Sequence, residues 1–125
     1  MSIDNVLTQY YAYANAGDWN NWCDLFAADM VMDEQLAGHV EGRERLRAMM
    51  SGFGDMYSSF QNVPRTFVVD HDNEQAAVIS RVVATSTAGE AIEADVVNYF
   101  MVHDDQITYM SNYHDTVPFK ALAAR

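Results

Sequence analysis

The sequence predicts an α+β fold in which three helices near the N-terminus cover one face of a mostly antiparallel sheet. Up to about residue 56, apolar residues recur at helical spacing, and beyond Pro64 they recur at the period of two that is typical of strands. Turn-forming Gly, Asn and Asp residues divide this second part into successive strands with no helix between them. At 125 residues, half of them hydrophobic, the chain is expected to form one domain, residues 1–125.

The helices are predicted from their apolar stripes. Residues 3–16 form the first, ended by Gly17, and Asp18 caps a second that carries Trp19, Trp22, Cys23 and Phe26 on one face. A short strand is predicted at Met30–Leu36 and a loop at Gly38–Gly42. The third helix is expected from Glu44 to about Met56, and to bury Leu46, Met49, Met50 and Phe53.

The last two strands, within Asp95–Asp115, carry three polar residues among apolar ones: Asn98, Asn112 and His114. Side chains alternate between the two faces of a strand, so the pairing register decides where these residues point. With a three-residue loop, Asn98 lies opposite Asn112 and shares its face with Phe100, Met110 and His114. A two-residue loop or a bulge would send Asn112 and His114 to the other face. We prefer the first register.

Charge restricts the class of partner. The net charge of −11 repels phosphate backbones and anionic membrane surfaces, so neither nucleic acid nor a membrane is an expected partner. A small apolar molecule is favoured instead. No His or Cys spacing suggests a metal site, no apolar run is long enough to span a membrane, and the N-terminus shows no secretory signal. The single cysteine, Cys23, suits a cytoplasmic protein.

Several local patterns together resemble the nuclear transport factor 2-like superfamily. They are Tyr10-x4-Asn15-Ala16-Gly17-Asp18, Leu25-Phe26-Ala27-x-Asp29, the strand to Glu34, Gly42-Arg43-Glu44-x-Leu46-Arg47 and Tyr113-x-Asp115-Thr116. Within the superfamily, the chain is most similar to ketosteroid isomerase and the SnoaL-like polyketide cyclases. This resemblance implies a cone-shaped fold, in which a strongly curved sheet wraps the helices and encloses a deep apolar pocket.

The resemblance also implies catalytic residues. The oxyanion-binding tyrosine of ketosteroid isomerase corresponds to Tyr10, its general-base aspartate to Glu34, and its second acid to Asn98. Two of these three residues differ from the family pattern, yet a base facing an oxyanion-binding pair is retained. The implied activity is a cofactor-independent isomerisation, cyclisation or dehydration of a small apolar carbonyl compound. SnoaL-like cyclases use an acid near the end of the chain, for which Asp115 is a candidate.

The pocket is expected to be lined by further residues that bind the substrate: Trp22, Phe26, Met49, Phe53, Phe100, Met110, Asn112 and His114. The alternatives are a solvated Glu34 at a strand end, a structural His114, and Asp115 as the cap of a C-terminal turn. An epoxide-hydrolase-like site is disfavoured because Asn112 stands where that class has an acid.

A second class of function is a non-catalytic module that binds a ligand or another protein. Members of the superfamily commonly dimerise through the outer face of the sheet, so the resemblance implies a homodimer. Tyr99, Met101, Tyr109 and Tyr113 would supply apolar and aromatic contacts on that face.

Overall fold

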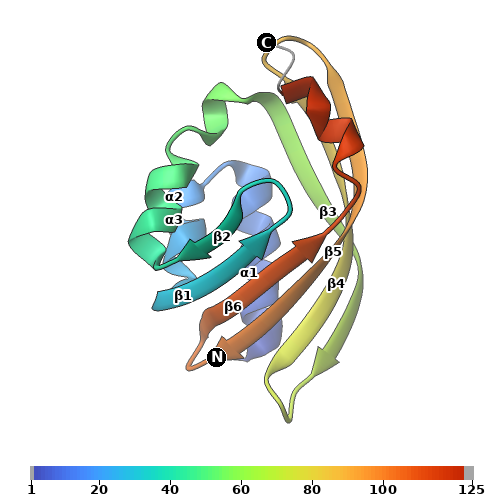
Figure 1. Ribbon diagram of the computed structural model, residues 1–125. Helices are drawn as coiled ribbons and strands as arrows, with labels where there is room; N and C mark the ends of the chain where they lie inside the picture. The colour runs from blue at the N-terminus through green and yellow to red at the C-terminus, as the bar shows by residue number, and fades with distance from the viewer. Residues whose placement is uncertain (1, 123–125) are drawn as a thin grey trace.

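A strongly curved six-stranded sheet wraps around three helices in the computed structural model of the protein, which describes residues 2–122 (Figure 1). The strand order is β2-β1-β6-β5-β4-β3, and neighbouring strands are antiparallel except for the parallel pair β1 and β6. The strands are β1 (Phe26–Glu34), β2 (Gly38–Glu41), β3 (Tyr57–Asp70), β4 (Gln75–Ser86), β5 (Ala91–His103) and β6 (Gln106–Tyr113). The predicted α+β class and cone shape are confirmed.

The helices lie on the concave face of this sheet: α1 (Ile3–Ala16), α2 (Trp19–Asp24) and α3 (Arg43–Met50) (Figure 1). Ser2 and Asp18 cap α1 and α2, since their side-chain oxygens accept hydrogen bonds from the backbone N–H groups of Asn5 and Asn21. Gly17 ends α1 in a left-handed conformation, with φ of 70°. Two short 3₁₀ helices, η1 (Phe53–Asp55) and η2 (Val117–Leu122), lie near the upper end of the cone in Figure 1.

Several element boundaries differ from the sequence-based expectations. The strand predicted from Met30 begins at Phe26 and ends at Glu34, and the predicted loop from Gly38 contains β2, which pairs with β1 as a hairpin. The third helix ends at Met50, because Gly52 and Gly54 follow and the chain continues as η1. The differences in the first strand and the third helix lie at element ends, where local sequence signals are weakest. The strand β2 was not predicted because its four residues are too few to show a period.

The strand β3 is longer than its sequence suggests, because it runs through Pro64 rather than starting after it. It is an edge strand, paired with β4 alone, so the N–H that proline lacks is not required at every position. The pairing also shifts by one residue between Pro64 and Thr66. The seven residues that precede Pro64 therefore belong to the sheet, and their inward side chains reach the interior.

The β5–β6 hairpin has the preferred register, with Asn98 opposite Asn112, but it reaches that register by another route. Its loop has two residues, Asp104 and Asp105, whose φ values of 50° and 63° are those of a tight hairpin turn. The pairing then shifts at Thr108, between the pairs Val102–Ile107 and Met101–Tyr109. The bulge compensates for the shorter loop, so Met110, Asn112 and His114 stay on the concave side.

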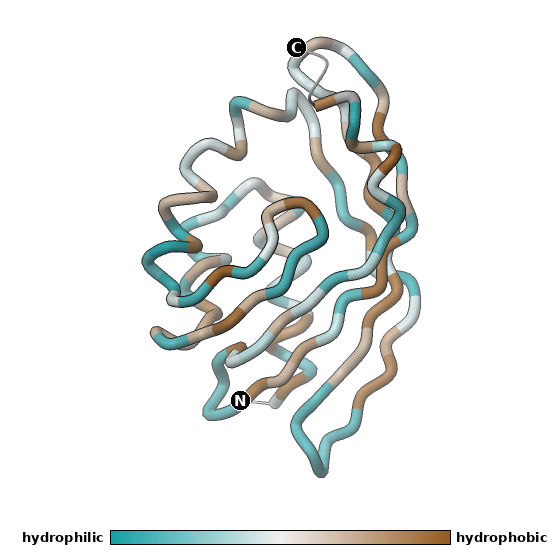
Figure 2. Tube along the Cα trace, in the orientation of Figure 1, coloured by the Kyte–Doolittle hydropathy of each residue, from teal (hydrophilic) through white to brown (hydrophobic). Residues whose placement is uncertain are grey.

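The core lies between the helices and the concave face of the sheet. Inward residues of β4 and β5 are buried, and Figure 2 shows the hydrophobic residues that run along these strands. The outer face keeps several large apolar side chains exposed: Val63, Val68, Ile79, Val83, Val97, Met101 and Tyr113. Among the described residues, no helix is long and apolar enough to cross a membrane.

Candidate active site

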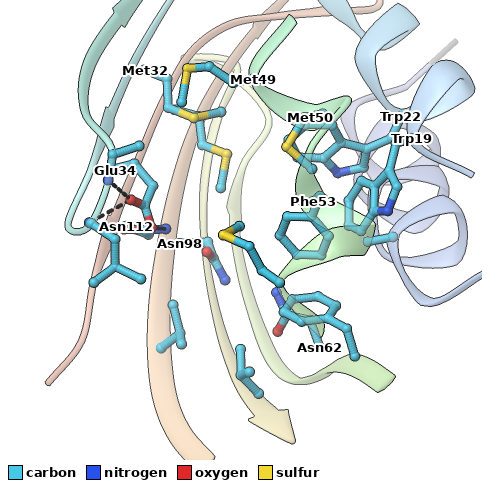
Figure 3. A pocket seen from close by; sticks show the side chains of 18 of the residues that line it. Trp19, Trp22, Met32, Glu34, Met49, Met50, Phe53, Asn62, Asn98 and Asn112 are labelled. Carbon is cyan, nitrogen blue, oxygen red and sulfur yellow. Dashed lines mark hydrogen bonds between the residues drawn. The ribbon is translucent and has the colours of Figure 1, made fainter. Parts of the chain in front are cut away.

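A cavity of about 340 Å³ lies between the helices and the concave face of the sheet (Figure 3). Its wall is mostly apolar, with aromatic residues from helices, strands and η2: Tyr10, Trp19, Trp22, Phe53, Tyr57, Phe60 and Phe119. Five methionines, Met32, Met49, Met50, Met56 and Met110, complete much of the remaining surface. Flexible thioether side chains can repack around different ligands, so this wall suits a small apolar molecule.

Glu34 is the one carboxylate among the described residues that line the cavity, and no Lys or Arg lines it. It ends β1, where Asp33 points to the outer face and binds His39 and Tyr109 at 2.7 Å each. The Glu34 side chain is 20% exposed. Its Oε2 accepts hydrogen bonds from the backbone N–H groups of Leu36, at 2.5 Å, and Ala37. The turn between β1 and β2 therefore holds the carboxylate in place (Figure 3).

The other oxygen of Glu34, Oε1, faces two residues from the end of the chain. Asn112 Nδ2 donates to it at 3.4 Å, and His114 Nε2 lies 3.9 Å away. The His114 ring is 3% exposed, and its Nδ1 lies 2.8 Å from the carbonyl oxygen of Asp115, which can only accept. A neutral His114 therefore carries its proton on Nδ1 and turns an unprotonated Nε2 toward Glu34.

Asn98 lies on β5 in the cavity wall and is 1% exposed. Its Nδ2 donates to the Tyr11 hydroxyl and to Ser80 Oγ, both at 2.9 Å. Both N–H bonds of the amide are thus occupied. Because both hydroxyl groups can also donate, a half-turn of the amide would keep both contacts and present the N–H groups to the cavity instead.

Two phenols in the wall remain neutral over the ordinary pH range. Burial raises the pKa of Tyr10 well above its usual value, with smaller contributions from Tyr11 and Glu34. Burial, followed by the Glu34 charge, raises the pKa of Tyr57 to about 12. A phenol that keeps its proton can donate a hydrogen bond to a developing oxyanion, and the water-poor wall strengthens that bond.

Of the eleven residues that the sequence indicated, nine line this one cavity. Tyr10, Glu34 and Asn98 are among them, together with six of the eight residues expected to bind substrate. Phe26 and Phe100 do not line it: both are fully buried behind the wall, where Phe26 packs on Trp22 and Phe100 on Tyr10. Their large apolar side chains are better accommodated in the core than beside a cavity.

Asp115 does not line the cavity either, because it caps the C-terminal turn. It is exposed, and its Oδ1 accepts a hydrogen bond from Val117 N at 2.9 Å. No arginine of the described residues lines the cavity. Arg81 lies on the outer face, where it pairs with Asp95 at 3.0 Å. No group of His, Cys, Asp and Glu among the described residues could hold a metal ion.

One polar residue of the wall, Asn62, was not expected from the sequence, and Trp22, which was expected there, carries a second unpaired polar group. Asn62 is 7% exposed, and Trp22 is 5% exposed; neither the amide Oδ1 nor the indole Nε1 has a hydrogen-bond partner among the described residues. Asn62 was missed because β3 was expected to begin after Pro64. Phe60 and Asn62 are two residues apart, and this spacing is the signal that could have placed both side chains on the inner face of a strand.

Solved structures with the same fold cover nearly the whole chain. TerC, crystallised with polyporic acid, matches with a TM-score of 0.84 and 18% identity over 98% of each chain. A proposed polyketide cyclase of Pseudomonas putida KT2440 matches with a TM-score of 0.82 and 21% identity, over 95% of this chain and 96% of the other. A nuclear transport factor 2-like protein of unknown function from Burkholderia pseudomallei K96243 reaches 0.88 with 15% identity over the whole of both chains.

The curved sheet and these neighbours show that the chain has the fold of nuclear transport factor 2-like proteins. The SnoaL-like domain model matches residues 7–110, and the chain therefore belongs to the SnoaL-like family. No curated protein matches the sequence significantly.

Proposed function

We propose that this protein is an enzyme that needs no cofactor and removes a proton next to the carbonyl group of a small, largely apolar compound. The observation that carries the proposal is a single held carboxylate, Glu34, in a mostly apolar cavity of about 340 Å³. Burying charge in such a wall is costly, so a chemical role is a reason for the carboxylate to be there.

In the proposed reaction, a Glu34 oxygen takes the proton from the carbon beside the carbonyl, and the C–H electron pair moves into a C=C bond. The carbonyl oxygen becomes an enolate oxygen and accepts a hydrogen bond from the Tyr10 hydroxyl. His114 accepts or returns the proton through its Nε2, which faces Glu34 Oε1 at 3.9 Å. Return of the proton to another carbon gives isomerisation; attack of the enolate on a second carbonyl gives cyclisation.

Asn98 would supply the second hydrogen bond to the enolate oxygen. Its N–H groups are bound to Tyr11 and Ser80, so this role requires the half-turn of the amide, which both hydroxyl groups can accommodate. Tyr10 needs no such change, and we assign it the larger share of the stabilisation. Removing one oxyanion donor commonly lowers the rate by about 100-fold or more.

Proton abstraction can be tested before the natural substrate is known. Small cyclic ketones and flavanones in D₂O exchange the protons beside their carbonyl, and mass spectrometry measures the rate. We expect the protein to accelerate exchange of at least one such ketone, and Glu34→Gln to abolish the acceleration. Glutamine keeps an oxygen that can accept from Leu36 and Ala37, so the turn is preserved. Glu90→Gln, on an exposed turn, is the matched control.

Full acceleration by Glu34→Gln would contradict the proposal. A different outcome would favour a non-catalytic ligand-binding domain: tight binding of ketones with no exchange in the parent protein. One observation supports that second function, because the two turn amides bound to Glu34 Oε2 give the carboxylate a structural role in the β1–β2 hairpin. Binding constants and exchange rates measured on the same ketones separate the two functions.

We also propose that the protein is a homodimer through the outer face of the sheet. That face exposes Val68, at 63%, together with Ile79, at 43%, and several other apolar residues of β4 and β5. Apolar surface of this kind on a sheet is typical of an interface between subunits. Light scattering at micromolar concentration should give twice the chain mass, and Val68→Glu should give the single-chain mass.

A further inference from the structure

The cavity has a second polar end, formed by Asn62 on β3 and Trp22 on α2. Both side chains are more than nine-tenths buried, and both line the cavity. The Asn62 Oδ1 and Trp22 Nε1 atoms have no hydrogen-bond partner among the described residues. Buried polar groups in folded proteins are nearly always paired, so two unpaired atoms in one cavity wall indicate a ligand that pairs them.

This polar end lies across the cavity from Glu34. Glu34 ends β1 and Asn62 lies on β3, and the strand order places β6, β5 and β4 between them. Four strand spacings correspond to roughly 19 Å along the curved sheet, and less across the cavity. Figure 3 shows Glu34 and Asn112 on one side, and Trp22 and Asn62 on the other. A molecule that spans the cavity can therefore contact both polar ends.

The backbone around Asn62 is held firmly. Asn15 on α1 donates from Nδ2 to the Asn62 carbonyl oxygen at 2.9 Å, and its Oδ1 accepts from Asn62 N at 2.7 Å. These two bonds tie β3 to α1 beside the cavity. The unpaired amide oxygen is an acceptor, which attracts a hydrogen-bond donor and repels a carbonyl or carboxylate oxygen.

We propose that the substrate carries a hydroxyl group at the end remote from its reactive carbonyl. The hydroxyl donates its hydrogen to Asn62 Oδ1, and the Trp22 indole N–H donates to an oxygen at the same end. Asn62 is then a specificity-determining residue: it selects hydroxylated ketones over their deoxy or methoxy counterparts. The inference rests on the proposed function, because it takes the Glu34 end as the place of the reactive carbonyl.

Three ligands test this selection: flavanone, 4′-hydroxyflavanone and 4′-methoxyflavanone. They share one carbonyl and differ at the far end, where only the hydroxyl compound can donate. Both tryptophans line the cavity, so quenching of their fluorescence reports binding. We expect the parent protein to bind 4′-hydroxyflavanone about five- to ten-fold more tightly than the other two. In Asn62→Leu this preference should disappear, whereas in Asn5→Leu, an exposed site on α1, it should persist.

The melting temperature of the unliganded protein is a second readout. Leucine has nearly the same size as asparagine and no unpaired oxygen, so Asn62→Leu should melt at a higher temperature than the parent. A lower melting temperature would overturn the proposal, because it would show that the amide already has a partner. Equal binding of the three ligands, binding of none of them, or a preference retained in Asn62→Leu would also overturn it.

The two proposals can fail separately. Glu34→Gln should keep the preference for the hydroxyl ligand, because the variant changes only the opposite end of the cavity. A preference for 4′-hydroxyflavanone without proton exchange would support the Asn62 contact while refuting the enzymatic reaction. Exchange without the preference would do the reverse.

Discussion

The contact between Asn98 and Tyr11 gives a sharp test of the cavity wall, through the variant Tyr11→Phe. The Tyr11 hydroxyl accepts from Asn98 Nδ2 at 2.9 Å, and the two residues are 3% and 1% exposed. Phenylalanine keeps the ring that packs against Tyr10 and Phe67, so the variant removes one oxygen atom and little else. One buried N–H of Asn98 then has no partner.

An unpaired buried donor costs about 1–3 kcal/mol, so we expect Tyr11→Phe to lower the free energy of unfolding by about 2 kcal/mol. For a chain of 125 residues, the entropy of unfolding is roughly 0.26 kcal/mol/K, so the melting temperature should fall by about 8 °C. Urea titration followed by circular dichroism measures the free energy, and a thermal scan measures the melting temperature.

Two further variants control this experiment. Tyr13→Phe removes a hydroxyl from the same helix that has no hydrogen bond to a described residue, and it should change the stability by less than about 0.5 kcal/mol. Combining Tyr11→Phe with Asn98→Leu and Ser80→Ala removes the whole polar group and should restore part of the loss. A Tyr11→Phe protein as stable as Tyr13→Phe would refute the argument.

Three other perturbations have expected outcomes. Above pH 10, unfolded tyrosines ionise, while the buried Tyr10, Tyr11 and Tyr57 keep their protons because their folded pKa values are raised. The free energy of unfolding should therefore fall as pH rises from about 10 to about 12. In urea titrations, Tyr57→Phe should reduce this slope by up to about 1.4 kcal/mol per pH unit. Hydrogen bonds from His39 and Tyr109 lower the pKa of Asp33, so the Asp33 carboxylate stabilises the fold at neutral pH and this stabilisation is lost as pH falls below about 4. In an acid titration, Tyr109→Phe should lose less stability than the parent protein. Leu46→Ala, at a site 1% exposed, should cost about 2–5 kcal/mol in urea unfolding, and a cost below 1 kcal/mol would contradict its place in the core.

The fold could be predicted because its signals are local and repeated. The apolar stripe of α1, with Ile3, Val6 and Leu7, and the alternation along β4 and β5 each extend over ten or more residues. The short hairpin formed by β1 and β2 carries no such pattern, because β2 has only four residues and is held by pairing with β1. Pairing between strands is a tertiary effect that no local period reports.

The site was predictable only in part, and for a similar reason. Glu34, Asn98 and Asn112 are polar residues in strands, a conflict with local preference that indicates a special position. Trp19 and Tyr57 carry no such conflict, since aromatic residues are ordinary in a helix stripe or a strand. Phe26 and Phe100 were expected in the cavity wall but lie behind it, because an apolar residue on the inner face can occupy either place. Only the depth of packing decides between the two.

The bulge at Thr108 sets which face the end of β6 turns toward the cavity. Deleting Thr108 would remove the bulge but keep Ile107 opposite Val102 and Tyr109 opposite Met101, so every later side chain of β6 would keep its face. Deleting one residue beyond the bulge, such as Ser111, would instead turn Asn112 and His114 to the outer face and point Tyr113 at the helices. At this end of the sheet, the position of a deletion therefore matters more than its length.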